Sequence, residues 1–92
     1  VLVAEGSIEA GAARRFAAEL EARGEYIRTV SLNSPGGSLD DALAIAKLIR
    51  EHGLETRVAE GALCASSCPL VMAGGTVRSA EERSAVGLHQ FY

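Results

Sequence analysis

The chain alternates between short apolar runs and longer segments in which apolar residues recur every three or four positions. Residues 1–4 form an apolar run closed by Glu5-Gly6-Ser7, which predicts a buried strand. Residues 9–23 carry apolar side chains at helical spacing, and Gly24 follows where a C-terminal cap is expected, so a helix is predicted there. Residues 26–32 are rich in β-branched and apolar side chains and predict a second strand.

A second helix is predicted after residue 38. Ser38 is a suitable N-cap, and Asp41 stands three residues later, in the position of a capping box. Gly53 ends the helix. Asp40 and Asp41 are therefore interpreted as first-turn and capping charges. The apolar residues expected to share one face of this helix are Leu39, Ala42, Leu43, Ala46 and Ile49.

The second half of the chain continues the alternation. Residues 56–59 predict a strand, 61–67 a loop, and about 68–73 a short helix with Pro69 in its first turn, ending at Gly74-Gly75. Residues 85–89 predict a further strand. Strands alternating with helices indicate an α/β fold with a mostly parallel sheet and right-handed crossovers. Ligands collect at the carboxyl ends of such strands, so segments 33–37 and 61–67 and His89 are expected to converge.

Length and charge narrow the functional classes. The 92 residues suffice for one small domain or part of a larger one, and a start without Met and a stop soon after His89 suggest a segment of a longer protein. The net charge of −3 without a basic stripe argues against nucleic acid as a partner. No apolar run approaches the roughly 20 residues that span a bilayer.

The two cysteines, Cys64 and Cys68, are four residues apart. Without a second cluster of Cys or His nearby, a zinc site is not expected. A local disulfide in an oxidising compartment and two reduced, half-buried thiols both fit the spacing.

Gly36 and Gly37 precede the second predicted helix. Glycine can take a positive φ and bring its backbone close to another group, and amides before a helix N-terminus can bind an anion or a developing oxyanion. The alternative is a simple Pro-Gly turn. The sequence has neither a phosphate-loop pattern nor Gly-x-Gly-x-x-Gly, so nucleotide binding has no support.

Ser66 and Ser67 stand at the start of the short predicted helix. A serine in this place can be activated as a nucleophile by a neighbouring base; alternatively, either serine simply caps the helix. His89, directly after a predicted strand, could reach a serine across the adjacent loop, whereas His52 at the end of the long helix is interpreted as a satisfied core or surface residue.

Three segments taken together resemble the proteolytic subunit of Clp protease and its superfamily, the Clp/crotonase fold. They are Asn33-Ser34-Pro35-Gly36-Gly37-Ser38, Cys64-Ala65-Ser66-Ser67-Cys68 and Leu88-His89-Gln90, and their order and spacing match over nearly the whole chain. The closer resemblance is to bacterial periplasmic Clp-like proteins, whose serine motif reads Cys-Ala-Ser-x-Cys and in which an Arg follows the helix, as Arg78 does here.

The resemblance implies a spiral of β-β-α units with a mostly parallel sheet flanked by helices, of which residues 1–92 would be a partial domain truncated at the C-terminus. It implies Ser66 as nucleophile and His89 as general base. The family's catalytic acid would lie beyond Tyr92, and Cys68-Pro69 departs from the small residues usual after the nucleophile.

The same resemblance assigns the remaining roles. The amides of Gly37 and Ser67 would form an oxyanion hole, and Pro35 and Gly36 would border an extended peptide substrate held by β-addition. It also favours a Cys64–Cys68 disulfide, export to the periplasm or another extracytoplasmic compartment, and a homo-oligomer of the full-length protein. No cofactor is expected.

Three functions remain open on this basis. The leading one is a serine peptidase that acts by a Ser-His mechanism. The second is a catalytically inactive module that binds peptides or assembles with partners. The third is a crotonase-type acyl-thioester enzyme, which uses the same oxyanion geometry without a Ser66-His89 pair.

Overall fold

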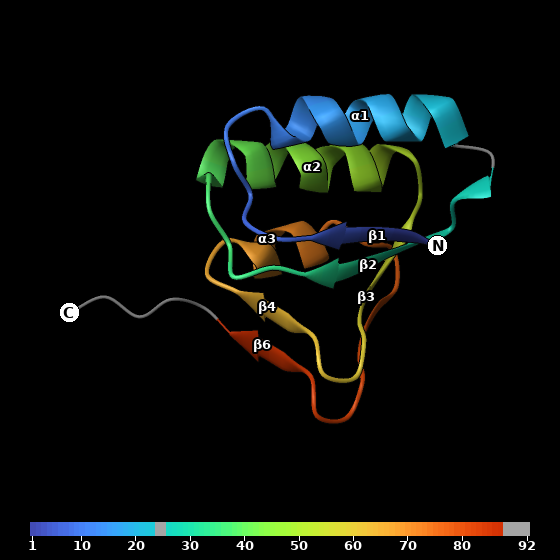
Figure 1. The fold of residues 1–92 in the computed structure, drawn as a ribbon. Helices are drawn as coiled ribbons and strands as arrows, with labels where there is room; N and C mark the ends of the chain where they lie inside the picture. The colour runs from blue at the N-terminus through green and yellow to red at the C-terminus, as the bar shows by residue number, and fades with distance from the viewer. Residues whose placement is uncertain (24–25, 88–92) are drawn as a thin grey trace.

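The computed structural model describes residues 1–23 and 26–87, which form nine helices and strands (Figure 1). The first half contains β1 (Leu2–Glu5), α1 (Ala12–Arg23), β2 (Thr29–Asn33) and α2 (Leu39–Glu51). The second half contains β3 (Glu55–Val58), β4 (Leu63–Ala65), α3 (Cys68–Met72), β5 (Arg78–Ala80) and β6 (Ala85–Gly87). None of these helices is long and apolar enough to cross a membrane.

All strand pairs are parallel. A four-stranded sheet has the order β1-β2-β3-β5, and β4 pairs with β6 in a separate two-stranded sheet. Because the order of the larger sheet follows the chain, right-handed crossovers place their helices on the same face. The helices accordingly form one layer, in which α1 packs on α2 and α2 on α3, and Figure 1 shows α1 and α2 above the sheet.

Alternation along the strands decides which side chains enter the core. Leu2, Val30 and Thr56 occupy neighbouring register positions and are buried under the helices. Val3, Ser31 and Arg57 form the next row and point to the opposite face, where they are half-buried or exposed. The sheet is therefore covered on one face within the described part of the chain.

The N-termini of both long helices are tied together by one carboxylate. Ser38 caps α2 by accepting a hydrogen bond from the Asp41 amide, and its hydroxyl donates to Asp41 Oδ2 at 2.9 Å. Asp41 Oδ1 accepts from the Ala13 amide of α1 at 3.0 Å. The predicted cap is confirmed, and its acid also joins two helices. The Ala13 amide, followed by the Ser38 hydroxyl, holds the pKa of Asp41 below its ordinary value.

Two elements begin three residues later than the sequence pattern predicts. Helix α1 starts at Ala12 because Gly11 has a φ of +90° and the backbone of Ile8 instead pairs with Gly37. Strand β2 starts at Thr29. Its pairing with β1 starts one residue later, at Val30, because β1 itself begins at Leu2, the partner of Val30.

Other expectations for single elements were wrong. The sequence pattern predicts a loop over 61–67, but residues 63–65 form β4, and it misses β5 altogether. Both strands have only three residues, and β5 is exposed, so neither produces an apolar period. Within α2 the core side consists of Ala42, Ile45 and Ile49, whereas Leu39 and Leu43 are more than half exposed.

Candidate active site

The glycine loop, residues 34–37, leaves the carboxyl end of β2 and is held from two sides. On one side Ile8 donates its amide to Gly36 O at 2.8 Å, and Ser38 donates to Ile8 O at 2.7 Å. Gly36 and Gly37 have φ values of +103° and +148°, in the region that favours glycine. An added Cβ at Gly36 would lie 2.6 Å from Ser66 Cβ and 2.9 Å from Ser67 N. The absence of a side chain therefore allows this loop to touch the second site segment.

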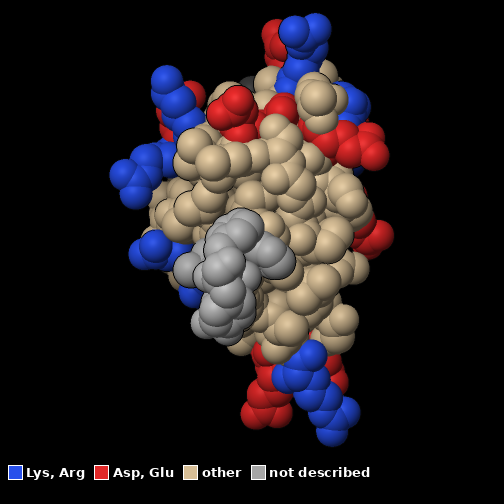
Figure 2. All heavy atoms as spheres, turned by 90° about the vertical axis from the view of Figure 1, so that its left-hand side faces the viewer, with Lys and Arg blue, Asp and Glu red and all other residues tan. Residues whose placement is uncertain are grey.

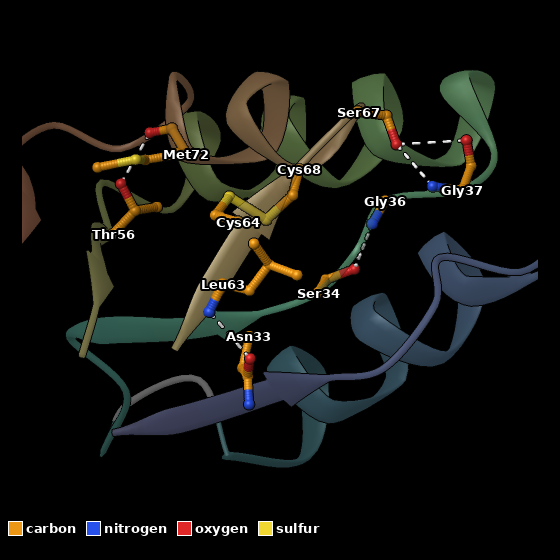
Figure 3. Close-up of a disulfide and its surroundings, with 10 residues drawn as sticks. All are labelled: Asn33, Ser34, Gly36, Gly37, Thr56, Leu63, Cys64, Ser67, Cys68 and Met72. Carbon is orange, nitrogen blue, oxygen red and sulfur yellow. Dashed lines mark hydrogen bonds between the residues drawn. A yellow bond between two sulfur atoms is a disulfide. The ribbon is translucent and has the colours of Figure 1, made fainter. Parts of the chain in front are cut away.

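The second segment is the serine turn, residues 64–68, between β4 and α3. Cys64 and Cys68 are joined by a disulfide with a Cα–Cα distance of 5.1 Å, and both are fully buried (Figure 3). Inside this closed turn Ser66 takes a φ of +58°. A non-glycine residue in the left-handed region carries roughly 1–3 kcal/mol of strain and is typical of functional sites.

Ser67 joins the two segments. Its hydroxyl accepts from the Gly37 amide at 2.9 Å and donates to Gly37 O at 3.3 Å, as Figure 3 shows. Ser67 is the N-cap residue of α3, yet its side chain makes no capping hydrogen bond. The alternative that a serine side chain merely caps this helix therefore does not apply to Ser67.

Two residues of the glycine-loop motif have structural roles that the sequence analysis did not assign. Ser34 is buried, and its hydroxyl accepts from the Gly36 amide at 3.1 Å. Asn33 Oδ1 accepts from the Leu63 amide of β4 at 3.1 Å. Both are hydrogen bonds between a side chain and the backbone, which Ser and Asn readily form in turns. The residue types at positions 33 and 34 were therefore the signal from which these roles could have been predicted.

Pro35 and Ser66 line a common cavity of about 490 Å³. Its other lining residues belong to β4, to β6 or to the residue preceding β6, and no lining residue is charged; they are Leu63, Ala65, Ser84, Ala85, Val86 and Gly87. The cavity thus borders the glycine loop, the serine turn and both strands of the small sheet.

The surroundings of the site are largely uncharged. Figure 2 views the molecule from the left-hand side of Figure 1, toward which the arrows of β1, β2, β4 and β6 point, and its charged side chains lie around the margin. Within the described residues, no three His, Cys, Asp or Glu side chains gather in a way that could hold a metal ion. The described part of the site therefore offers hydroxyl and amide groups as its chemistry.

The structure brings together the predicted residues of the first two segments. Pro35, Gly36, Gly37, Ser66 and Ser67 all lie within the contacts described above. His89, the predicted base, lies outside the described residues. Gly87 is the last described residue before His89 in the chain, and its carbonyl accepts a hydrogen bond from the Ser66 amide at 3.0 Å.

No protein-family model matches the chain, and no curated protein matches it by sequence. Solved structures match in fold. The catalytic domain of the ClpP protease from Plasmodium falciparum has a TM-score of 0.73 and 21% identity, with 98% of this chain and 53% of that chain covered.

A second group of matches is the 1510-N membrane-bound stomatin-specific protease. One variant of it gives a TM-score of 0.71 at 17% identity, covering 90% of this chain and 43% of that chain. Another variant, in complex with a substrate peptide, gives 0.70 at 17% identity, covering 90% and 41%. This chain thus spans about half the length of the structures it matches or less.

These neighbours share the fold that the sequence pattern predicts, a parallel sheet with helices. Their sequence identities to this chain are low, so the likeness shows the fold alone. The chain is therefore a mixed α/β protein with the Clp protease-like fold.

Proposed function

We propose that this chain supplies the nucleophile and oxyanion-binding half of a serine peptidase. The observation that carries the proposal is the placement of Ser66 in a strained turn that lines the cavity and touches Gly36. A hydroxyl nucleophile and adjacent backbone amides are the parts that acyl transfer requires.

In the proposed reaction, Ser66 Oγ attacks the carbonyl carbon of a peptide bond. The new C–O bond forms as the carbonyl π pair moves onto oxygen, and His89 takes the serine proton. The pair then returns to carbon as the C–N bond breaks, His89 gives the proton to the leaving amine, and water afterwards hydrolyses the acyl-serine ester. The Ser67 amide supports the oxyanion role, because no acceptor for it lies among the described residues. Gly37 would supply the second amide.

Covalent geometry supports His89 as the base. The Ser66 amide is bonded to Gly87 O, and only Leu88 separates Gly87 from His89, so at most about 7 Å of extended chain joins them. The proposed base thus follows directly on the strand that borders the serine turn. The catalytic acid is proposed to come from a part of the full-length protein beyond these 92 residues.

The cavity supports a peptide as substrate. Its lining is uncharged and includes β4 and β6, and an extended peptide can add to a strand edge through main-chain hydrogen bonds. We therefore expect substrate peptides to carry apolar or uncharged side chains at the residues next to the cleaved bond.

A fluorophosphonate probe applied to the full-length protein tests the proposal. Ser66 Oγ would displace fluoride from phosphorus and form a stable O–P bond. Labelling is expected in the wild type, lost in Ser66→Ala, and kept in Ser79→Ala, which removes an exposed serine of β5 outside the cavity. A folded wild type that never reacts would contradict the peptidase and leave the peptide-binding module.

We also propose that the full-length protein resides in an oxidising compartment outside the cytoplasm. The buried Cys64–Cys68 disulfide supports this proposal. Protein isolated from its natural host with rapid thiol alkylation should carry no alkyl group on either cysteine. Alkylation of both would place the protein in a reducing compartment.

A further inference from the structure

The hydrogen bond between Ser67 and Gly37 affects the proposed oxyanion hole, and its significance for catalysis rests on that proposed function. The Gly37 amide has a single proton, and that proton is directed to Ser67 Oγ at 2.9 Å. The hydroxyl proton is in turn directed to Gly37 O at 3.3 Å. The two groups therefore satisfy each other, and a substrate oxygen would have to compete for the amide.

We propose that the Ser67 hydroxyl is a positioning group that occupies the Gly37 amide at rest and yields it to the oxyanion during the reaction. A serine hydroxyl and a neutral substrate carbonyl are acceptors of similar strength, whereas hydrogen bonds to a charged oxygen are roughly twice as strong. The oxyanion can therefore displace the hydroxyl, whereas a neutral carbonyl gains little by doing so. The Ser67–Gly37 hydrogen bond must be broken in this exchange, and its free energy is added to the barrier of the reaction.

The glycine loop does not need this hydroxyl to stay in place. Gly36 O and Ser38 N are both bonded to the backbone of Ile8, at 2.8 and 2.7 Å. The Gly36 amide is bonded to Ser34 Oγ. Ser34 also bonds the loop to the other segment, donating its amide to Leu63 O and accepting from Ala65 N at its carbonyl. Removing the Ser67 hydroxyl would therefore release the Gly37 amide while these bonds keep the loop in place.

The hydroxyl also has no second task in the described structure. Ser67 is 5% exposed and its side chain makes no capping hydrogen bond to α3, and the two hydrogen bonds of its hydroxyl both go to Gly37. The side chain thus acts on the site through Gly37, separately from the proposed role of the Ser67 amide.

The test compares fluorophosphonate labelling rates of full-length wild type, Ser67→Ala, Ser67→Gly and Ser67→Thr. Release of one hydrogen bond of about 1 kcal/mol predicts about 5-fold faster labelling in Ser67→Ala. Ser67→Gly should behave alike, and it serves where the alanine variant folds poorly, since glycine is tolerated at N-caps. Ser67→Thr restores a hydroxyl and should return the rate toward that of the wild type.

Hydrogen exchange of the Gly37 amide gives a readout independent of chemistry. It should be faster in Ser67→Ala and Ser67→Gly than in the wild type, and be slowed again in Ser67→Thr. Unchanged exchange in the two variants without a hydroxyl would overturn the inference.

The labelling results separate this inference from the proposed function. If the wild type reacts, and native-like Ser67→Ala and Ser67→Gly react at the same rate or more slowly, the inference fails and the peptidase stands. If the wild type does not react at all, the peptidase fails and the inference falls with it.

Discussion

At the scale of single residues, the site depends on a side chain that is absent. Gly36 lies so close to the serine turn that a Cβ would meet Ser66 Cβ at 2.6 Å and Ala65 O at 2.7 Å. A backbone oxygen and the first atom of a side chain cannot move aside without moving the turn itself. The Pro-Gly-Gly sequence indicated a special backbone here, and the structure identifies what the backbone approaches.

We expect Gly36→Ala to destabilise the protein more than Gly6→Ala. Both positions have positive φ, +103° and +90°, so both pay the left-handed penalty of about 1–2 kcal/mol. Nothing lies within 4 Å of a Cβ at Gly6, whereas the contacts at Gly36 should add about 1–3 kcal/mol of overpacking. Denaturant unfolding of the two variants measures the difference, and equal losses would contradict the close approach of the two segments.

At the scale of secondary-structure elements, polar side chains fix the helices in place. Asp41 joins the N-termini of α1 and α2, and buried Thr56 of β3 donates its hydroxyl to Met72 O at the end of α3, at 2.7 Å. The capping role of Ser38 and Asp41 could be predicted from the sequence because the two residues of a capping box are only three positions apart. The bonds to Ala13 and Met72 join residues that are far apart in the chain.

Asp41→Asn should lower stability in a pH-dependent way. The pKa of Asp41 is lowered in the folded protein, chiefly by the Ala13 amide. Its contribution is therefore fully present above its ordinary pKa of 3.8 and is lost as the pH falls through the lower folded value. Thermal unfolding should show the variant melting below the wild type at pH 7, with the gap narrowing under acid conditions.

Asp40→Asn provides the matched control for this change. It removes a neighbouring first-turn charge of α2 without removing the bond to Ala13. At pH 7 it should melt closer to the wild type than Asp41→Asn does. Equal melting temperatures for the two variants would mean that the hydrogen bond between Asp41 and Ala13 adds no stability, and that Asp41 acts only as a negative charge at the N-terminus of α2.

Thr56→Val should loosen the end of α3. The substitution keeps the shape of the side chain but removes the donor to Met72 O, which retains a hydrogen bond from the Gly75 amide at 3.1 Å. We expect a loss of about 1 kcal/mol and faster hydrogen exchange of the Ala73 and Gly74 amides. Thr56→Ser keeps the donor and should preserve the protection of these two amides. Equally fast hydrogen exchange in both variants would contradict a role of the Thr56 hydroxyl in holding the end of α3.

At the scale of the whole molecule, the site is part of the core rather than an addition to it. The disulfide beneath the serine turn belongs to the main cluster of buried residues, together with residues of β2, α2 and β3. The loops of the site are bonded to each other through Ser34, whose amide donates to Leu63 O at 2.6 Å and whose carbonyl accepts from Ala65 N at 3.0 Å.

Labelling competence of the full-length protein should therefore disappear in the same denaturant transition as its secondary structure. Because the site segments share buried contacts with the sheet, they are expected to open only when the domain unfolds. Parallel titrations by circular dichroism and by fluorophosphonate labelling measure both midpoints. Loss of labelling at clearly lower denaturant would show that the site opens separately from the fold.

The sequence alone determined the order of most strands and helices, the cap at Ser38 and the three segments that carry candidate chemistry. These are local properties, set by periodicity and by residues a few positions apart. Its prediction of a parallel α/β fold is confirmed by the structure and by the fold of its neighbours.

Only the tertiary structure decided the short strands β4 and β5, the exposed position of Leu43 on α2 and the partner of the Ser67 hydroxyl. Each depends on residues distant in the chain; Gly37 and Ser67, for example, are 30 positions apart. A three-residue strand acquires its conformation from the ladder it joins rather than from its own side chains. A hydroxyl, likewise, has no fixed partner until folding brings an amide within reach.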